Sequence, residues 1–250
     1  MAITDTPRST GARWQSYQDR FRSGKWRGPI FRDIVLDDIR AAGEGATVLD
    51  IGCGHGFDGD IRLQRSLAES GCRYIGVEPD TAIAPGEHVS EVYRALFEDA
   101  PIPPGSLQVA FAVMVLEHVA QPQRFWDKAW EVLADGGVFW GFTMDGRHRF
   151  CQASALTERL GLKDLYLHFL RGQRGTDRYE NYPVQYRCNT PAQIAPCAAA
   201  FRECEFISFT AVGQLNYFIP RPLRPLTNCL DRLDIWLNRP GSLLAVRAVK

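Results

Sequence analysis

The sequence lacks any apolar run that approaches the roughly 20 consecutive residues needed to span a bilayer, and its polar N-terminus lacks the apolar core of a signal peptide. Neither charge is in excess, because 29 Lys and Arg residues balance 29 Asp and Glu residues. A net charge of zero gives no overall field that would attract nucleic acid. We therefore expect a cytoplasmic protein with no transmembrane segment and no nucleic-acid partner.

Paired cysteines are also missing. The seven cysteines are odd in number, dispersed, and form no C-x-x-C pair. Free thiols in a reducing compartment are the simplest interpretation, and we expect no metal site. What the chain does contain is 45% hydrophobic residues among 250, which is enough for a substantial core in a single domain.

A glycine-rich stretch, D-I-G-C-G-H-G from Asp50 to Gly56, follows a short apolar strand and precedes a helix-like segment. Glycine allows positive φ and carries no Cβ, so a ligand can approach its backbone. The helix behind the turn presents unpaired N–H groups at its N-terminus. The stretch predicts a cofactor-binding corner, and its D-x-G-x-G-x-G spacing differs from the G-x-G-x-x-G of dinucleotide folds.

Three further blocks follow along the chain. The strand R-Y-I-G-V-E-P-D over 73–80 places Glu78 at its end, where a carboxylate can accept both hydroxyls of a ribose. The other blocks are E-D-A-P-I-P over 98–103, which precedes a strand leading into L-E-H-V, and V-L-A-D-G-G over 132–137. As a set, the four blocks resemble the class I S-adenosylmethionine (SAM)-dependent methyltransferases in order and spacing. The resemblance covers roughly residues 45–145 and is closest to small-molecule methyltransferases of the ubiquinone-biosynthesis type.

This resemblance implies a single α/β domain, a Rossmann-like three-layer sandwich with a seven-stranded, mostly parallel sheet and a cap insertion. The expected parts are an N-terminal helical lid over 1–43, a SAM-binding core over 44–145, a substrate cap over 146–190, and a C-terminal part over 191–250. That last part is expected to hold a helix, an antiparallel strand pair and a long insertion.

The resemblance also implies the contacts to SAM. Within the expected set, Asp50 orients the glycine turn and approaches the methionine amino group. This sequence has Leu96 where many relatives carry an Asp for adenine, so the backbone of Phe97 and the side chain of Glu98 or Asp99 are expected there; a solvated loop is the alternative for both acids. The predicted cofactor-binding residues are Asp50, Gly52, Cys53, Gly54, Gly56, Glu78, Pro79, Phe97, Glu98 and Met114.

His118 is the first candidate for a catalytic residue, because it follows the fourth strand at the edge where ligands bind in such folds. Imidazole suits a general base for a hydroxyl or amine nucleophile; the alternative is that His118 packs the start of the next helix. His148 and His168 are secondary candidates. Near the N-terminus, Tyr17 or Arg27 is expected to reach the methionine end if the lid closes over the cofactor, and a structural role is the alternative.

Two later segments bear on partners. Basic and aromatic residues gather in 146–190, which favours an anionic or sugar-bearing acceptor, or else a solvated basic face. Residues 215–241 mix apolar residues with arginines, which favours a peripheral membrane or dimer contact, or a simple cover over the sheet edge.

The predicted activity is methyl transfer from SAM to an O- or N-nucleophile of a small-molecule acceptor, with S-adenosyl-L-homocysteine as the other product. An anionic, sugar or lipid-linked metabolite fits the acceptor. Three alternatives stay open: a C-methyltransferase acting on a small molecule, an NAD-dependent oxidoreductase, and a SAM-binding protein without catalysis.

Overall fold

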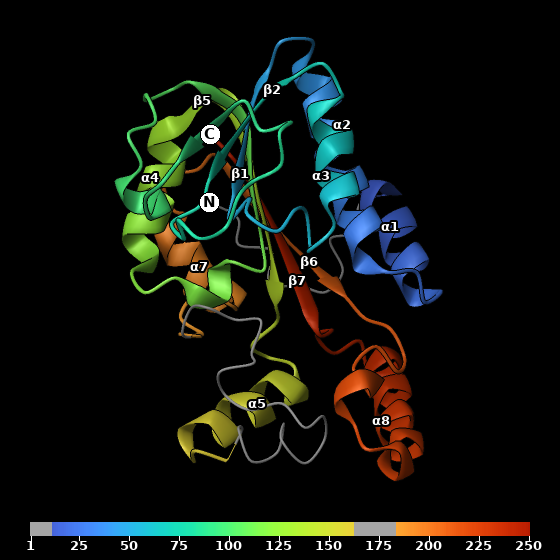
Figure 1. Cartoon of the computed structure of the whole chain (residues 1–250). Helices are drawn as coiled ribbons and strands as arrows, with labels where there is room; N and C mark the ends of the chain where they lie inside the picture. Colours follow the sequence, from blue (N-terminus) through green and yellow to red (C-terminus); the bar gives the residue numbers. More distant parts are fainter. Residues whose placement is uncertain (1–11, 163–183) are drawn as a thin grey trace.

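The computed structural model describes residues 12–162 and 184–250, and within them one sheet has the strand order β3-β2-β1-β4-β5-β7-β6 (Figure 1). Strands β1 to β5 run parallel, whereas β7 is antiparallel to both β5 and β6. The strands are β1 (Thr47–Ile51), β2 (Arg73–Val77), β3 (Glu91–Tyr93), β4 (Leu107–Val113), β5 (Leu133–Met144), β6 (Glu203–Phe209) and β7 (Leu243–Val249). The predicted seven-stranded, mostly parallel sheet and its final antiparallel pair are confirmed.

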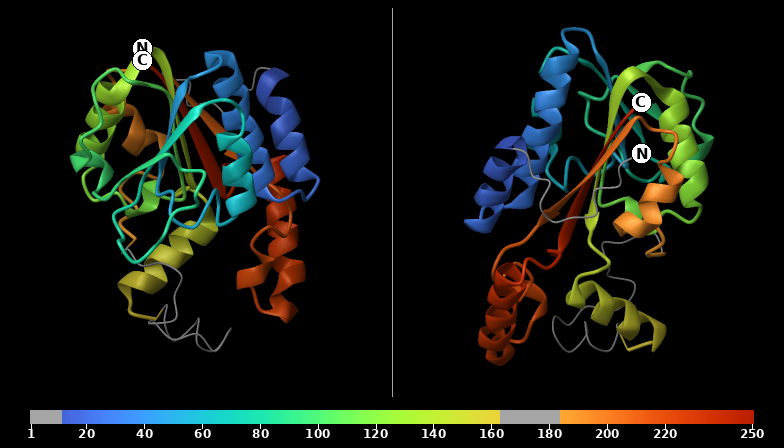
Figure 2. Two further views of the ribbon diagram at one scale, coloured as in Figure 1. Left: turned by 45° about the horizontal axis from the view of Figure 1, so that its top comes forward. Right: turned by 180° about the vertical axis from the view of Figure 1, so that it is seen from behind.

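Helices cover both faces of the sheet. Helices α1, α2 and α3 lie on one face, and α4 and α7 lie on the other (Figures 1 and 2). The α-helices are α1 (Ala12–Arg22), α2 (Arg27–Ala42), α3 (Ile61–Ala68), α4 (Pro122–Val132), α5 (Arg149–Arg159), α7 (Pro191–Cys197) and α8 (Arg224–Trp236). Short 3-10 turns are η1 (Phe97–Asp99), η2 (Leu116–His118), η4 (Asn216–Phe218) and η5 (Arg221–Leu223). This arrangement is the expected three-layer sandwich.

Strand β5 contributes side chains to the hydrophobic cores on both faces of the sheet, because successive side chains of a strand point to opposite faces. Phe139 packs toward α4, with its ring 5.0 Å from that of Trp126. Its neighbour Trp140 packs on the other face, 5.3 Å from Trp14 of α1, and donates to buried Asp38 at 2.7 Å. The sheet is thereby buried on both sides, as parallel sheets usually are.

No described residue of helix α1, which belongs to the predicted N-terminal lid, lines the large cavity described below. Helix α1 instead lies along the edge strand β6, where Trp14 donates to Glu205 at 3.2 Å and Gln18 donates to the carbonyl of Ser208 at 2.8 Å. Tyr17 bonds to Asp37 of α2. Among the described residues of the predicted lid, Arg27 at the start of α2 lines this cavity.

Segment 215–241 does not cover the sheet edge, so that alternative is wrong. Helix α8 lies beyond the ends of β6 and β7, on the side where the parallel strands have their carboxyl ends (Figures 1 and 2). Among the described residues, no helix combines the length and the apolarity that crossing a bilayer requires.

Candidate active site

A cavity of about 650 Å³ opens at the carboxyl ends of β1, β2 and β4. Its volume lies within the range of about 300–1,000 Å³ that is usual for ligand pockets. In open α/β sheets, ligands bind in the crevice outside this edge. The residues that line it include Gly52, Gly56, Glu78, Pro79, Phe97, Glu98, Met114 and His118, all of which were predicted from the sequence.

The glycine turn after β1 forms one wall of the cavity. Gly52 and Gly56 have φ values of 82° and 89°, which side chains rarely adopt. A Cβ at Gly56 would also stand 2.6 Å from the backbone nitrogen of Ile61 at the start of α3. Glycine is therefore required here by the close packing of the turn on the helix N-terminus.

Glu78, at the end of β2, is buried and held from two sides. Its Oε2 accepts from the N–H of Gly54 at 3.1 Å, and its Oε1 accepts from the N–H of Asp80 at 2.9 Å. An ionised carboxylate offers about four acceptor positions. Two positions are thus used to fix the side chain, and two remain for a ligand that offers a pair of hydroxyls.

Asp50, Cys53 and Gly54 were predicted to contact the cofactor, but they lie behind the cavity wall. Asp50 is buried and accepts from Gln64 Nε2 at 2.8 Å and from the hydroxyl of Tyr74 at 2.7 Å. The same Gln64 nitrogen donates to the carbonyl of Cys53 at 2.7 Å. The side chain of Asp50 therefore braces the glycine turn through Gln64, because it leaves the strand on the face away from the cavity.

Burial also sets the protonation of this bracing group. Loss of solvent raises the pKa of Asp50 to about 6, although the hydrogen bonds from Gln64 and Tyr74 act in the opposite direction. The thiol of Cys53 is fully buried, close to Gly76, and burial raises its pKa as well. Gly54 contributes through its N–H, which bonds to Glu78.

The turn η1 forms the wall opposite the glycine turn. Phe97 lines the cavity and packs on Phe125, with ring centroids 4.9 Å apart. Glu98 and Asp99 line it too, and Asp99 forms an ion pair with Arg124 at 2.8 Å. The departure from the family pattern at Leu96 therefore places that apolar side chain at the cavity, next to two acids.

Turn η2 brings the L-E-H-V block to the cavity. Met114, with φ of 56°, turns the chain out of β4 and donates its N–H to the carbonyl of Phe142 at 2.7 Å. Both Glu117 and His118 then line the cavity. His118 thus lies on the cavity wall, as its position after the fourth strand predicted.

Glu117 is a cavity residue that the sequence analysis missed, although it lies within the quoted motif. Its Oε2 accepts from the hydroxyl of Thr143 at 2.9 Å, and that hydroxyl accepts from Asn189 Nδ2 at 2.6 Å. Burial raises the pKa of the Glu117 carboxyl, and the nearby His118 opposes that rise. A buried carboxylate beside an imidazole is a typical arrangement for proton transfer.

An ion pair between Arg27 and Asp58 closes another part of the wall. The two side chains approach to 2.8 Å, and the carboxylate of Asp58 is almost completely buried. Asp58 was also missed, because it follows the glycine motif at a loop position with φ of 52° that no spacing rule singles out.

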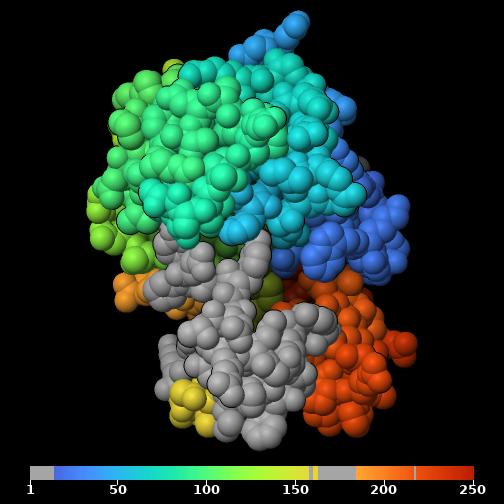
Figure 3. All heavy atoms as spheres, in the orientation of Figure 1, coloured from blue at the N-terminus to red at the C-terminus, as the bar shows by residue number. Residues whose placement is uncertain are grey.

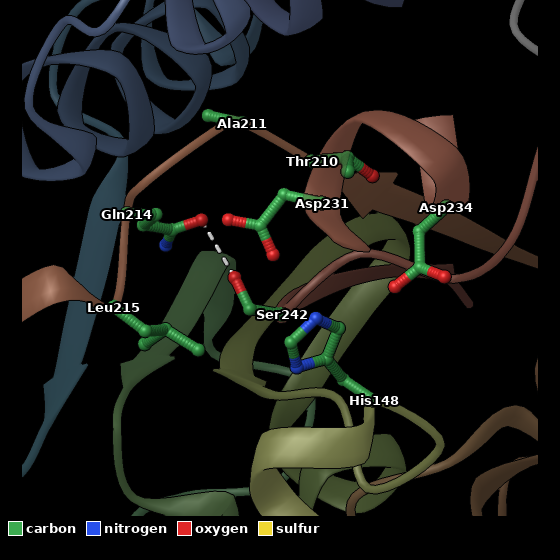
Figure 4. Close-up of a pocket in the computed structure, with 8 residues that line it drawn as sticks. All are labelled: His148, Thr210, Ala211, Gln214, Leu215, Asp231, Asp234 and Ser242. Carbon is green, nitrogen blue, oxygen red and sulfur yellow. Dashed lines mark hydrogen bonds between the residues drawn. The ribbon is translucent and has the colours of Figure 1, made fainter. Parts of the chain in front are cut away.

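His148 was predicted as a secondary base, but it does not line the large cavity. It is buried in a separate small pocket with Asp231, Asp234 and Ser242 (Figure 4). Burial is the largest factor that lowers its pKa, followed by the charge of Arg149. The other secondary candidate, His168, lies outside the described residues.

Three basic residues of the predicted cap are held by other groups. Arg147 pairs with Asp145, Arg149 pairs with Asp231 and Asp234, and Arg187 donates to the carbonyl of Ala120 at 3.2 Å. The chain at 185–186 does approach the site, because both of its N–H groups donate to the carbonyl of Glu117. Within the described residues, no cluster of three His, Cys, Asp or Glu side chains is arranged to hold a metal ion.

The sheet order, the glycine turn and the acidic residue after β2 are typical of α/β proteins that bind a nucleoside-type ligand at the carboxyl edge of the sheet. The family model described as a methyltransferase domain matches residues 49–141. An uncharacterized methyltransferase of Mycolicibacterium gilvum is 30% identical over 184 residues, which are 66% of this chain and 62% of the relative. A probable S-adenosylmethionine-dependent methyltransferase of Mycolicibacterium smegmatis is 31% identical over 113 residues, which are 43% of this chain and 41% of the relative.

Solved structures agree on the fold. A SAM-dependent methyltransferase of Thermotoga maritima, described as a possible histamine N-methyltransferase, has a TM-score of 0.52 and 16% identity over 95% of this chain and 93% of its own. Phosphoethanolamine N-methyltransferase 2 of Haemonchus contortus, in complex with SAM, has a TM-score of 0.52 and 13% identity over 87% of this chain and 52% of its own. The family model and these relatives support a class I SAM-dependent methyltransferase. It spans 62% of the length of the Mycolicibacterium gilvum relative.

Proposed function

We propose that this chain binds SAM in the cavity at the carboxyl edge of the sheet and transfers its methyl group to a small-molecule acceptor. The observation that supports this most strongly is Glu78, a buried carboxylate that the glycine turn holds with two acceptor positions free. Two free positions suit the paired hydroxyls of a ribose. The residues proposed to hold SAM on the cavity wall are Gly52, Gly56, Glu78, Pro79, Phe97, Glu98 and Met114.

When bound, SAM supplies a methyl group on a positively charged sulfur, which is already a strong electrophile. The chain's task is therefore mainly to align an acceptor and to keep water out. His118 is proposed to take the proton of a hydroxyl or amine acceptor, and Glu117 beside it stabilises the imidazolium that results. The acids on the cavity wall suit a bound group that carries positive charge, whereas the charge of Arg27 on the same wall is paired with Asp58.

An O- or N-nucleophile is the proposed acceptor, because a base is useful when the attacking atom must lose a proton. Within the acceptors of this class, an anionic, sugar or lipid-linked metabolite fits the predicted cap.

Calorimetry of the purified chain with SAM, S-adenosyl-L-homocysteine and NAD tests the cofactor. We expect binding of the first two and none of NAD. Formation of S-adenosyl-L-homocysteine with a panel of hydroxyl, amine and carboxylate acceptors then tests the reaction. Binding of NAD in place of SAM would overturn the proposal, and SAM binding without turnover of any acceptor would favour a binding protein.

A further inference from the structure

Helix α8 and the residue at each of its ends carry a leucine stripe that the described parts of the chain leave exposed. Five leucines recur at alternating spacings of three and four residues, which places them on one side of a helix. The exposed fraction reaches 61% for Leu226, and Trp236, on the same exposed side, is 79% exposed. The stripe consists of Leu223, Leu226, Leu230, Leu233 and Leu237. Its setting is a lobe that protrudes below the body of the protein (Figure 3).

The charges of this lobe are sorted between its two sides. Asp231 and Asp234 turn inward toward the small pocket of His148 (Figure 4), and both pair with Arg149 of α5. Asp231 also accepts from the N–H of Gly213 at 2.8 Å. The acids of the helix are thus used to fix α8 to the rest of the molecule.

The exposed side of this lobe carries positive charge. Arg221 and Arg232 are exposed, and within the described part of the chain neither has an acidic partner. A leucine stripe, an exposed tryptophan and flanking arginines are the features of helices that lie in the interface of an anionic membrane. We propose that this face, defined as the leucine stripe with Trp236, Arg221 and Arg232, binds an anionic lipid surface.

A second copy of the chain fits this face less well. One side of a helix of 13 residues is about 20 Å long and offers a few hundred Å², whereas a stable interface needs about 800 Å² from each partner. A twofold contact would also bring the arginines of two copies together without acids on the outward side. Neither the small area nor the arginines prevent binding to a bilayer, because an anionic bilayer supplies negative charge and an extended apolar layer.

Helix α8 and the large cavity lie at the same edge of the sheet. Segment 210–242 joins the end of β6 to the start of β7, and Leu243 of β7 pairs with Met144 at the carboxyl end of β5. The face therefore lies on the same edge of the sheet as the large cavity. A chain seated on a membrane through α8 would hold its cavity near that surface, where amphipathic acceptors concentrate.

Sedimentation with vesicles of phosphatidylcholine containing about one third phosphatidylglycerol tests the proposal on the full chain. We expect about tenfold stronger binding than to pure phosphatidylcholine, and a loss of this difference at high salt. Leu226→Gln/Leu230→Gln/Leu233→Gln is expected to abolish binding, and Arg221→Gln/Arg232→Gln to weaken it about tenfold. Since the altered residues are exposed, circular dichroism and the thermal midpoint should stay unchanged.

Matched controls are available on other elements. Leu156→Gln/Leu160→Gln changes two exposed leucines of α5 and its C-terminal end, and Arg40→Gln/Arg65→Gln changes two exposed arginines of α2 and α3. Both controls should bind vesicles like the unaltered chain, and so should Glu78→Ala, because the contact does not depend on the cofactor site. Absence of vesicle binding would overturn the proposal. Light scattering would then show whether a dimer covers the face, and a monomer would indicate that another part of the chain does.

Discussion

The carboxylate of Glu78 accepts a hydrogen bond from the N–H of Gly54 at 3.1 Å, so the acid after the second strand and the turn after the first strand form one unit. Neither group is placed correctly without the other. A Cβ at Gly54 would stand 2.5 Å from Oε2 of Glu78. The glycine is therefore needed for the approach of a protein side chain, in addition to any approach of the ligand.

Replacement of Glu78 is expected to weaken the binding of SAM. Glu78→Ala removes hydrogen bonds to a charged acceptor, for which about 1.5–3 kcal/mol is typical, or roughly 10- to 150-fold in affinity. Calorimetry measures the change. Glu91→Ala is a suitable control, because Glu91 is an exposed acid of β3 that pairs with Arg73 and should leave the affinity unchanged. Unchanged affinity in a folded Glu78→Ala protein would contradict the ribose assignment.

Gly54→Val is expected to abolish SAM binding by displacing Glu78. Its branched side chain would also meet Ile83, 2.7 Å from the ideal Cβ position. A thermal-shift assay should then show a folded protein that SAM no longer stabilises. Gly105→Ala is the control: that glycine has φ of 66° with open space around it, so the variant should lose some stability and keep the SAM-induced shift. A normal shift in Gly54→Val would place the cofactor elsewhere.

His118→Ala is expected to lower kcat by about 10²–10⁴-fold with little change in SAM affinity, as for loss of a general base. His55 also lines the cavity, but on the glycine turn, so His55→Ala should retain its turnover. Retained turnover in His118→Ala would make this histidine a packing residue.

Glu117→Gln separates the two groups that η2 brings to the cavity. The amide keeps an oxygen that can accept from Thr143, so the fold around it should persist. If Glu117 only stabilises the imidazolium, the variant should lose roughly 10- to 100-fold in kcat, the scale of one hydrogen bond to a charged group. A larger loss than that in His118→Ala would show that Glu117 is the base.

The buried Asp50 predicts how stability depends on pH. Its pKa is raised from 3.8 to about 6, so between those values the folded state holds a proton that the unfolded state has released. Stability from this group is therefore present at low pH and is lost as pH rises through about 6, by roughly 3 kcal/mol at most. Asp50→Asn should remove this dependence while its oxygen still accepts from Gln64 and Tyr74. Urea unfolding of both proteins at pH 4.5 and pH 7 measures it, and parallel changes in the two would contradict the assignment.

Several features of the fold and the site could be predicted from the sequence because they depend on short-range rules. The glycine turn was predictable because the backbone there needs positive φ at Gly52 and Gly56. Glu78 was predictable because an acid that ends a buried strand must lie at the carboxyl edge of the sheet. Short apolar runs likewise indicated the strands, and the order of the four blocks indicated the resemblance to the methyltransferases.

Other features were decided by the tertiary structure alone. Whether Asp50 faces the cavity depends on which face of the sheet its position on β1 points to. In the folded chain its carboxylate accepts hydrogen bonds from Gln64 and Tyr74 instead. His148 lies outside the large cavity because the chain leaves the sheet after β5 and places this residue in the small pocket. No sequence motif indicates where the chain goes at that point.

The contacts of Glu117 and of helix α8 could not be predicted from the sequence either. The partner of Glu117 is Thr143, which Asn189 holds in turn from a point 46 residues further along the chain. Likewise, the acids of α8 face inward only because Arg149 lies there to meet them. The sequence by itself determined the resemblance to the methyltransferases and the backbone of the glycine turn, because both depend on residues that are adjacent in the chain. Only the tertiary structure decided which charges meet and which remain exposed, because those pairings join segments that are far apart in the chain.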